Sequence, residues 1–356
     1  MCGGTRHSHY RRVGESSPFV HGGSAADRDD VLSLNAIGSY DKNGAMAGRF
    51  APSPTGDLHL GNLRTALVAA LLARTTGREF VIRMEDLDLV TASSDFEDRQ
   101  IEDLAAIGVT TSRQIVRQSE RFELYRQAIS QLTDSGDAYP CYCSRREIRA
   151  EIETAARAPH GNLPDGAYPG TCRDLTANQR AEREAEGRQP ALRLRTSGET
   201  YVVNDLVAGR FVGGIDDVVL ARSDGVPAYN LAVVVDDAAQ GIDQVVRGDD
   251  LLSSTPRQMH LQHLLGLPTP EYAHVPLVLG EMGSRLAKRD GAITLRELLK
   301  RGETVNSVRD AIAQSIGCQP VKSDSDPFAE WSAHWSLARL SREPMYLSAF
   351  DLAVDS

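Results

Sequence analysis

Cysteine, long apolar runs and net positive charge are all scarce in this sequence. Its 356 residues include 5 Cys, too few for a disulfide scaffold, and no secretory apolar segment precedes them. The longest aliphatic stretch, Thr65–Ala73, is about half of the roughly 20 residues that a membrane helix needs. We therefore expect a cytoplasmic protein with no membrane partner.

The charge balance excludes a uniformly basic nucleic-acid binder. Lys and Arg number 39 against 49 Asp and Glu, which gives a formal net charge of -10. A local basic groove is compatible with this balance, so an RNA partner is not excluded. With 41% apolar and 25% charged residues the composition is that of a globular protein. The length exceeds the roughly 250–300 residues at which one core stops growing, so we expect more than one domain.

The first 45 residues differ from the rest of the chain. They are rich in Gly, Ser, Arg, His and Asp and have no sustained apolar period, which predicts a disordered N-terminal extension over residues 1–46. Asp27, Asp29 and Asp30 are untypical of a transit peptide. Alternatively, translation begins at Met46.

An α/β pattern starts at Arg49. Strand candidates at Gly48–Ala51 and Phe80–Met84 alternate with helix candidates over about Leu60–Ala73 and Asp95–Ile107. This alternation predicts an α/β fold with a doubly wound, Rossmann-like parallel sheet and crossover helices. We expect residues 47–140 and 201–291 to form its two halves.

Residues 141–200 interrupt this pattern and are expected to form an insertion with three cysteines. The βα pattern is expected to resume with Ala191–Arg195, Tyr201–Val207 and Val218–Arg222. Residues 292–356 are expected to form a short α-rich C-terminal extension with a loop at Ser323–Pro327. One helix there is amphipathic, with an apolar face made by Val305, Val308, Ile312 and Ile316.

A nucleotide signature lies at the first predicted strand–helix junction. Arg49–Asn62 reads RFAPSPTGDLHLGN, so a strand leads through a tight turn into a helix, where free N–H groups and the helix dipole bind phosphate. His59 would face phosphate oxygens, and Gly61 would leave room for a flat base. A His-x-Gly-Asn turn alone is also typical of a simple helix cap.

A second segment, Gly283–Gly291, reads GSRLAKRDG. Its cations Arg285, Lys288 and Arg289 could offset the charge that develops on a transferred phosphate. Alone, this segment would be a solvated basic loop.

Together the two segments resemble the HIGH and KMSKS motifs of class I aminoacyl-tRNA synthetases, in the wording of the glutamyl-tRNA synthetase branch. The resemblance continues through Arg83–Asp88, Tyr229–Asp237 and Val246–Asp250 in the family's order. It covers about residues 47–295. It implies the family's catalytic domain, ATP-dependent activation of L-glutamate to an adenylate, and Mg²⁺ bound with the ATP.

The resemblance also implies roles for individual residues. His59 and Lys288 would be catalytic. Arg49 and Arg247 would meet substrate carboxylate and Glu85 the ammonium. The implied ATP-binding residues are Pro52, Pro54, Thr55, Gly56, His59, Gly61, Asn62, Arg285 and Lys288, and the implied glutamate-binding residues are Arg49, Phe50, Ala51, Pro52, Ser53, Glu85, Tyr229 and Arg247.

Three positions depart from the generic motifs. Asn62 replaces the second histidine, which costs one potential phosphate contact. Arg285 and Ala287 replace the usual first lysine and the serine, so one hydroxyl is lost. Because Lys288 is retained, we expect activity.

The insertion contains a candidate metal site. Cys141, Cys143 and Cys172 suit one structural Zn²⁺ ion, although three buried free cysteines are the alternative. No histidine follows Cys172, and His160 lies on the intervening loop. The resemblance offers Tyr168 as the fourth ligand, as in the glutamyl-Q tRNA(Asp) synthetases.

That branch attaches glutamate to the queuosine base of tRNA(Asp), which implies ATP, L-glutamate and the tRNA(Asp) anticodon stem-loop as partners. The stretch after Gly291 is too short for a complete anticodon-binding domain, which favours this branch, and we expect a monomer. Two alternatives stay open: a truncated glutamyl-tRNA synthetase that charges a tRNA 3′ end, and a non-catalytic tRNA- or nucleotide-binding protein. The candidate RNA-binding residues in the insertion are Arg145, Arg146, Arg149 and Arg173.

Overall fold

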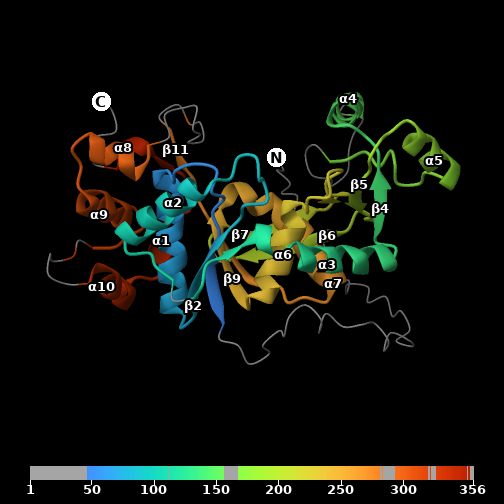
Figure 1. Cartoon of the computed structure of the whole chain (residues 1–356). Coiled ribbons are helices and arrows are strands. Elements are labelled where there is room, and N and C mark those ends of the chain that lie inside the picture. The colour runs from blue at the N-terminus through green and yellow to red at the C-terminus, as the bar shows by residue number, and fades with distance from the viewer. Residues whose placement is uncertain are drawn as a thin grey trace, which may run out of the picture. The chain divides into compact units, whose positions relative to one another are not determined.

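A computed structural model describes residues 46–111, 113–155, 167–280, 283, 293–319, 321, 326–350 and 352 (Figure 1). All of them belong to the compact unit Leu34–Ser356. The expected disordered extension, His160 and the segment with Arg285 and Lys288 lie outside the described residues.

The core of the fold is a five-stranded sheet in the order β10-β9-β1-β2-β3, in which all neighbouring strands are parallel. Its strands are β1 (Ala47–Phe50), β2 (Glu79–Met84), β3 (Val116–Arg117), β9 (Ile242–Gly248) and β10 (Glu271–Val275). Early strands lie on one side of β1 and late strands on the other, so the strand order reverses at β1. The predicted doubly wound sheet is thereby confirmed, and ligands bind such sheets at the carboxyl ends beside the reversal.

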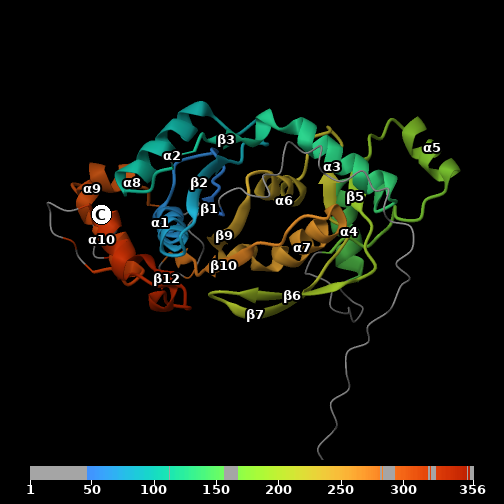
Figure 2. The same cartoon turned by 90° about the horizontal axis from the view of Figure 1, so that it is seen from below.

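Helix α1 (Leu60–Thr75) is buried along most of its length. It packs against β1, β2 and β9 on one side and against α9 (Val305–Ser315) and α10 (Pro327–His334) on another (Figure 2). The largest apolar cluster therefore joins the sheet to the C-terminal helices. The other helices of this part are α2 (Ser94–Ala106), α3 (Phe122–Asp134), α6 (Tyr229–Ala239) and α7 (Thr255–Leu265), with short 3-10 turns at Gln118–Glu120 and Asp249–Ser254.

The strands between residues 138 and 221, within the expected insertion and on either side of it, pair in antiparallel fashion. Strands β4 (Ala138–Cys141), β5 (Ala191–Leu194) and β8 (Val219–Ala221) form one sheet, and β6 (Thr200–Asp205) and β7 (Gly209–Gly214) form a hairpin. The expectation that a βα pattern resumes here is therefore wrong. A parallel crossover needs about a dozen residues, and the links β5–β6, β6–β7 and β7–β8 are too short to hold a crossover helix. Helices α4 (Arg145–Ala155) and α5 (Ala177–Ala185) complete this part.

The C-terminal part is helical, with α8 (Leu295–Lys300), α9 and α10 and 3-10 turns at Leu337–Arg339 and Leu347–Ala349. In the expected amphipathic helix, Val308, Ile312 and Ile316 are fully buried. Pro327, expected in a loop, instead opens α10 behind the N-cap Asp326. Strand β12 (Met345–Tyr346) pairs in parallel with β11 (Val278–Leu279). None of the described helices has both the length and the apolarity to span a membrane.

Candidate functional site

A cavity of about 810 Å³ opens at the carboxyl ends of β1, β2 and β9 and at the start of α1. This is the position that the strand reversal at β1 predicts for a ligand. Most of the described candidate residues line it, although they come from four separate segments of the chain. They are Arg49, Phe50, Ala51, Pro52, Ser53, Thr55, Gly56, His59, Gly61, Asn62, Glu85, Tyr229 and Arg247.

Pro54 is buried but does not line this cavity. Its carbonyl accepts a hydrogen bond from the Ser93 N–H at 3.0 Å, so it links the turn to the start of α2. Gln100 on α2 donates to the carbonyls of Ser53 and Gly56 at 3.0 and 2.6 Å. The loop after β1 is therefore held in shape by α2.

His59 is the N-cap of α1. Its Nδ1 accepts a hydrogen bond from the Asn62 N–H at 3.3 Å, and the Asn62 side-chain oxygen accepts one from the His59 N–H at 3.2 Å. Through this reciprocal capping box, the Asn62 amide stabilises the start of α1 at the position where the generic motif has a histidine. Burial lowers the pKa of His59 to about 4, with Asp250 opposing the shift. The neutral ring therefore keeps its proton on Nε2.

The first turn of α1 leaves one amide for a ligand. The Leu60 N–H donates to the Ile293 carbonyl at 3.0 Å, and the Asn62 N–H is used by the cap. The Gly61 N–H, at the edge of the cavity, has no hydrogen-bond partner among the described residues. A Cβ at Gly61 would lie 3.1 Å from the His59 ring and 3.4 Å from Val278. The close neighbours of Gly61 are therefore protein atoms.

Arg49 and Arg83 share one carboxylate. The Arg49 Nε and Nη2 atoms donate to the two oxygens of Asp237 at 3.3 Å, and Arg83 Nη1 donates to Asp237 at 2.7 Å. Arg83 Nη2 also donates to Glu85 at 3.2 Å. Burial raises the pKa of Glu85, and the two arginines oppose this shift. A buried cluster of alternating charges therefore lies beside the cavity, and Arg49 and Glu85 are its members that line the cavity.

Sequence reasoning missed Arg83, Asp236 and Asp237 as parts of this site. Asp236 is fully buried and accepts hydrogen bonds from Gln118, Arg121 and Tyr125 at 2.8, 2.6 and 2.7 Å. The available signal was a pair of acidic residues directly after an apolar helical run, Leu231–Val235. Charges in such a run are buried and must be paired.

Arg247 has a different environment. Its guanidinium donates to His274 Nε2 at 3.0 Å, to Gln258 Oε1 at 2.8 Å and to the Thr255 hydroxyl at 2.9 Å. Its side chain is buried, and Tyr272 lies beneath it with the ring centroid 5.4 Å from Cζ. Tyr229 closes this side of the cavity and is 37% exposed.

The second motif, with Arg285, Ala287 and Lys288, lies outside the described residues, so the roles of Arg285 and Lys288 stay predictions. The described chain on both sides of it reaches the cavity, since Val278 and Thr294 both line it. Thr294 also forms a β-bridge with His59.

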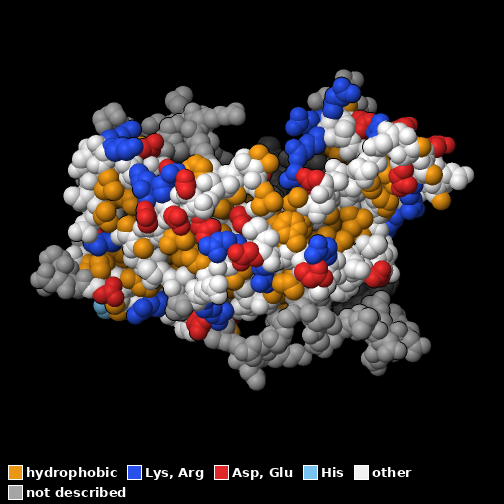
Figure 3. Space-filling model, in the orientation of Figure 1, with side chains coloured by type: hydrophobic (Ala, Val, Ile, Leu, Met, Phe, Trp, Pro, Cys, Tyr) orange, Lys and Arg blue, Asp and Glu red, His pale blue; other side chains and the backbone are white. Residues whose placement is uncertain are grey.

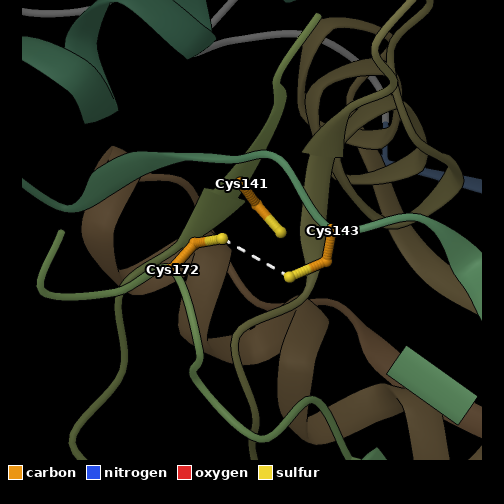
Figure 4. Close-up of side chains that lie close together, drawn as sticks. All are labelled: Cys141, Cys143 and Cys172. Atoms are coloured by element: carbon orange, nitrogen blue, oxygen red, sulfur yellow. Dashed lines mark hydrogen bonds between the residues drawn. The ribbon is translucent and has the colours of Figure 1, made fainter. Parts of the chain in front are cut away.

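The three insertion cysteines come together as expected (Figure 4). Their sulfur atoms lie within 4.8 Å of one another, and Cys143 Sγ is 3.4 Å from Cys172 Sγ. The Tyr168 hydroxyl lies 3.4 Å from the sulfurs of both Cys141 and Cys143. The hydrogen bond with Cys143 lowers the pKa of the Cys141 thiol to about 5, although burial opposes this. Three thiols and one phenol oxygen in this arrangement fit a tetrahedral metal ion.

Known proteins resemble this chain closely. The family described as "tRNA synthetases class I (E and Q), catalytic domain" matches residues 45–319. A "Glutamyl-Q tRNA(Asp) synthetase" of Nocardia farcinica is 56% identical over 302 residues, which cover 85% of this chain and 93% of that protein. A "Glutamate--tRNA ligase" of Heliobacterium modesticaldum is 43% identical over 310 residues, 83% of this chain and 61% of that protein.

A solved structure agrees with these matches. The glutamate tRNA ligase from Elizabethkingia meningosepticum, in complex with its amino acid, superimposes with a TM-score of 0.70 at 28% identity. The match covers 86% of this chain and 68% of that one.

Proposed function

The chain belongs to the class I tRNA synthetases of the E and Q family and is a ligase, and on this premise we propose that it activates L-glutamate with ATP and transfers it to the queuosine base of tRNA(Asp). The observation that carries the proposal is the 56% identity to a glutamyl-Q tRNA(Asp) synthetase across 93% of that protein's length. The buried arginines that line the cavity and the geometry at the start of α1 support it.

The proposed reaction has two steps. A glutamate carboxylate oxygen attacks the α-phosphorus of ATP, the bond from that phosphorus to the bridging oxygen breaks, and pyrophosphate leaves. A hydroxyl of the queuosine base then attacks the carbonyl carbon of the adenylate, loses its proton, and AMP leaves. The protein mainly aligns the reactants and stabilises the charge that develops on phosphorus.

Residues of the first motif would bind the ATP. The His59 Nε2–H and the Gly61 N–H are the donors at the start of α1, where the helix dipole also favours an anion. Lys288 and Arg285 are proposed to add positive charge at the same phosphates. Class I synthetases use ATP with Mg²⁺, which neutralises charge on the departing pyrophosphate.

Buried groups of both charges lie at the cavity, as a glutamate zwitterion with its extra carboxylate requires. Arg49, Glu85 and Arg247 line it, and Arg83, Asp236 and Asp237 pair with one another and with Arg49 and Glu85 beside it. We assign substrate carboxylates to Arg49 and Arg247, because planar guanidinium groups bind carboxylates through two N–H groups. Glu85 would accept the ammonium, which would oppose the rise in its pKa on burial.

The rest of the pocket would fix the orientation of the substrate. Phe50, Ala51, Pro52, Ser53 and Tyr229 line the cavity together with Arg49, and we propose that the Tyr229 hydroxyl adds a polar contact. Pro52 also accepts a hydrogen bond from the Glu85 N–H at 2.9 Å through its carbonyl. This bond couples the two segments that are proposed to hold opposite ends of the amino acid.

The three cysteines and Tyr168 would hold one structural Zn²⁺ ion. When bound, the ion would cross-link the chain on both sides of the insertion loop. The same site positions α4, which follows Cys143 directly. Metal binding would therefore support the part of the insertion that we propose to meet RNA.

A basic patch on α4 supports an RNA partner. Arg145, Arg146 and Arg149 are exposed and have no ion-pair partner among the described residues. Figure 3 shows Lys and Arg side chains gathered over this helix. Arg173, in contrast, is paired with buried Asp217 at 2.7 Å, so its charge is neutralised. We propose that the α4 patch binds phosphates of the tRNA(Asp) anticodon stem-loop.

The proposal is tested by glutamate-dependent ATP–pyrophosphate exchange and by transfer of labelled glutamate to tRNA(Asp). We expect exchange without tRNA, and transfer to queuosine-containing tRNA(Asp) but not to the same tRNA without queuosine. Retention of the label after enzymatic removal of the 3′ end would exclude 3′ charging. Exchange that needs tRNA(Glu) and labels its 3′ end would favour the glutamate–tRNA ligase function of the 43% identical relative. Lack of exchange by folded protein with Mg²⁺ would refute both.

A further inference from the structure

The two arginines proposed to meet substrate carboxylates are held in different ways. Arg49 contacts a carboxylate, Asp237, so much of its charge is already neutralised. All three described hydrogen-bond acceptors of Arg247 are neutral side chains: His274, Gln258 and Thr255. These contacts fix the plane of the guanidinium, and none of the three acceptors carries a negative charge.

Arg247 also keeps donors for a ligand. A guanidinium has five N–H groups, and the described contacts use one on each of its three nitrogen atoms. One N–H on each terminal nitrogen is left. Because Arg247 lines the cavity, these two groups are available to a substrate carboxylate.

His274 can accept the Arg247 Nε–H only in one tautomer. Its Nε2 must be unprotonated, so the ring proton must lie on Nδ1, which is 2.6 Å from the Asp205 carboxylate. Asp205 is itself fixed, because it accepts hydrogen bonds from the N–H groups of Val207 and Ala208 at 2.9 and 2.8 Å and from the His274 N–H at 3.1 Å. The side chains of Asp205 and His274 are both fully buried.

The β6–β7 hairpin supplies this support. Asp205 is the last residue of β6, and His274 lies on β10 next to Arg247 on β9 in the parallel register. The hairpin that sequence analysis assigned to the main sheet therefore lies behind the substrate cavity. It reaches the proposed substrate-binding arginine through one histidine.

We propose that Asp205 and His274 are positioning residues for the amino-acid substrate: Asp205 fixes the tautomer and plane of His274, and His274 then orients the Arg247 guanidinium toward a substrate carboxylate. The inference rests on the proposed function, since it assumes that the amino acid binds in this cavity. A neutral acceptor suits this role, because a carboxylate at the same place would neutralise Arg247 and weaken its attraction for the substrate.

Two substitutions of His274 separate its contacts. In H274N, the Asn side chain can donate a hydrogen bond to Asp205 from the position that Nδ1 occupies, but it leaves Arg247 Nε without an acceptor. Gln in H274Q places its carbonyl oxygen near the position of Nε2 and keeps that acceptor. The matched control is H260N: His260 is also buried and bonded to a neighbour, Tyr201, at 2.9 Å, but does not contact Arg247.

The experiment measures ATP–pyrophosphate exchange by the full chain with glutamate and ATP varied separately. A hydrogen bond to a charged group is worth roughly tenfold or more in binding. We expect H274N to raise the KM for glutamate by about tenfold and to leave the KM for ATP unchanged. H260N should keep the KM for glutamate within about twofold of wild type. H274Q keeps the acceptor but loses the donor to Asp205, so its KM for glutamate should lie between those of wild type and H274N.

Each result decides the proposal. An unchanged KM for glutamate in folded H274N, or equal rises in the KM values for glutamate and ATP, would overturn it while wild-type activity upholds the proposed function. If H274N does not fold, H274Q alone carries the test, and a tenfold rise in its KM for glutamate would overturn the acceptor role. Absence of exchange by the wild-type protein would overturn the proposed function and this inference with it.

Discussion

Replacing Asp237 with asparagine should strongly destabilise the protein. Asp237 is the carboxylate shared by Arg49 and Arg83, and its side chain is 8% exposed while those of the arginines are 4% and 0% exposed. The D237N variant keeps the shape of the side chain and removes its charge. Two buried guanidinium groups would then share no anion at this position.

The magnitude follows from the burial. Removing one partner of a buried ion pair costs about 3–5 kcal/mol in the free energy of unfolding, because the remaining charge is buried without compensation. The control is D243N. Asp243 pairs with Arg78 at 2.9 Å, but its side chain is 32% exposed, so solvent screening limits the loss to about 1 kcal/mol or less.

Thermal unfolding of wild type, D237N and D243N at pH 7 measures this difference. In domains of about 150–250 residues each kcal/mol shifts Tm by roughly 2–4 °C, so D237N should lower Tm by at least about 6 °C and D243N by less than about 4 °C. The arginines hold the pKa of Asp237 below its usual range despite burial. Its stabilisation is therefore fully present at pH 7 and is lost only as the pH falls through that lowered pKa. Equal Tm shifts in the two variants would refute the reasoning.

Three further predictions concern catalysis, metal and RNA. H59N should keep the cap of α1, because its amide oxygen can accept the Asn62 N–H, but lower kcat for pyrophosphate exchange about 100-fold through loss of the Nε2–H donor. Since the pKa of His59 is about 4, titration of this residue should not lower the exchange rate of the wild type between pH 8 and pH 6. A fall in the wild-type rate with a midpoint near pH 6.5 that is absent in H59N would contradict this. Elemental analysis should find zinc in the wild type and in C318S, whose cysteine is buried elsewhere, and much less in C172S; equal zinc in all three would exclude the cysteine site. Replacing the three α4 arginines with glutamine should weaken tRNA binding and reduce the slope of log K against log salt by roughly 2–3, while tRNA-independent exchange stays unchanged. The control R126Q removes an arginine that is paired with Glu123 on α3 and should change neither quantity. An unchanged slope in the triple variant would exclude the patch.

Local signals allowed much of the fold to be predicted. The helix expected over about Leu60–Ala73 is α1, Leu60–Thr75, and the second buried strand extends over Glu79–Met84. Both depend on apolar patterns and turn residues within a few positions of each other. The antiparallel strands after Ala191 were assigned wrongly, since strand pairing depends on which distant partner is available.

The candidate cavity residues could be named from motifs, but their electrostatic environment could not. Arg49 and Arg83 meet Asp237 across 188 and 154 residues of sequence. His274 and Asp205 are 69 residues apart and had no motif of their own. Polar residues of this kind are recognisable only when folding has removed water from around them and left one partner within reach.

The family, the strand–turn–helix at Arg49–Asn62 and the three cysteines of the insertion could all be recognised from the sequence, because they are patterns of residue type and spacing along one chain. The packed fold was needed to show that two arginines share Asp237, that Arg247 has neutral hydrogen-bond partners, and that the β6–β7 hairpin supports Arg247 through His274. These features depend on burial and on distances between separate segments. Both quantities are set when the sheet and its helices pack, since that packing fixes which charges lose water and which partners replace it.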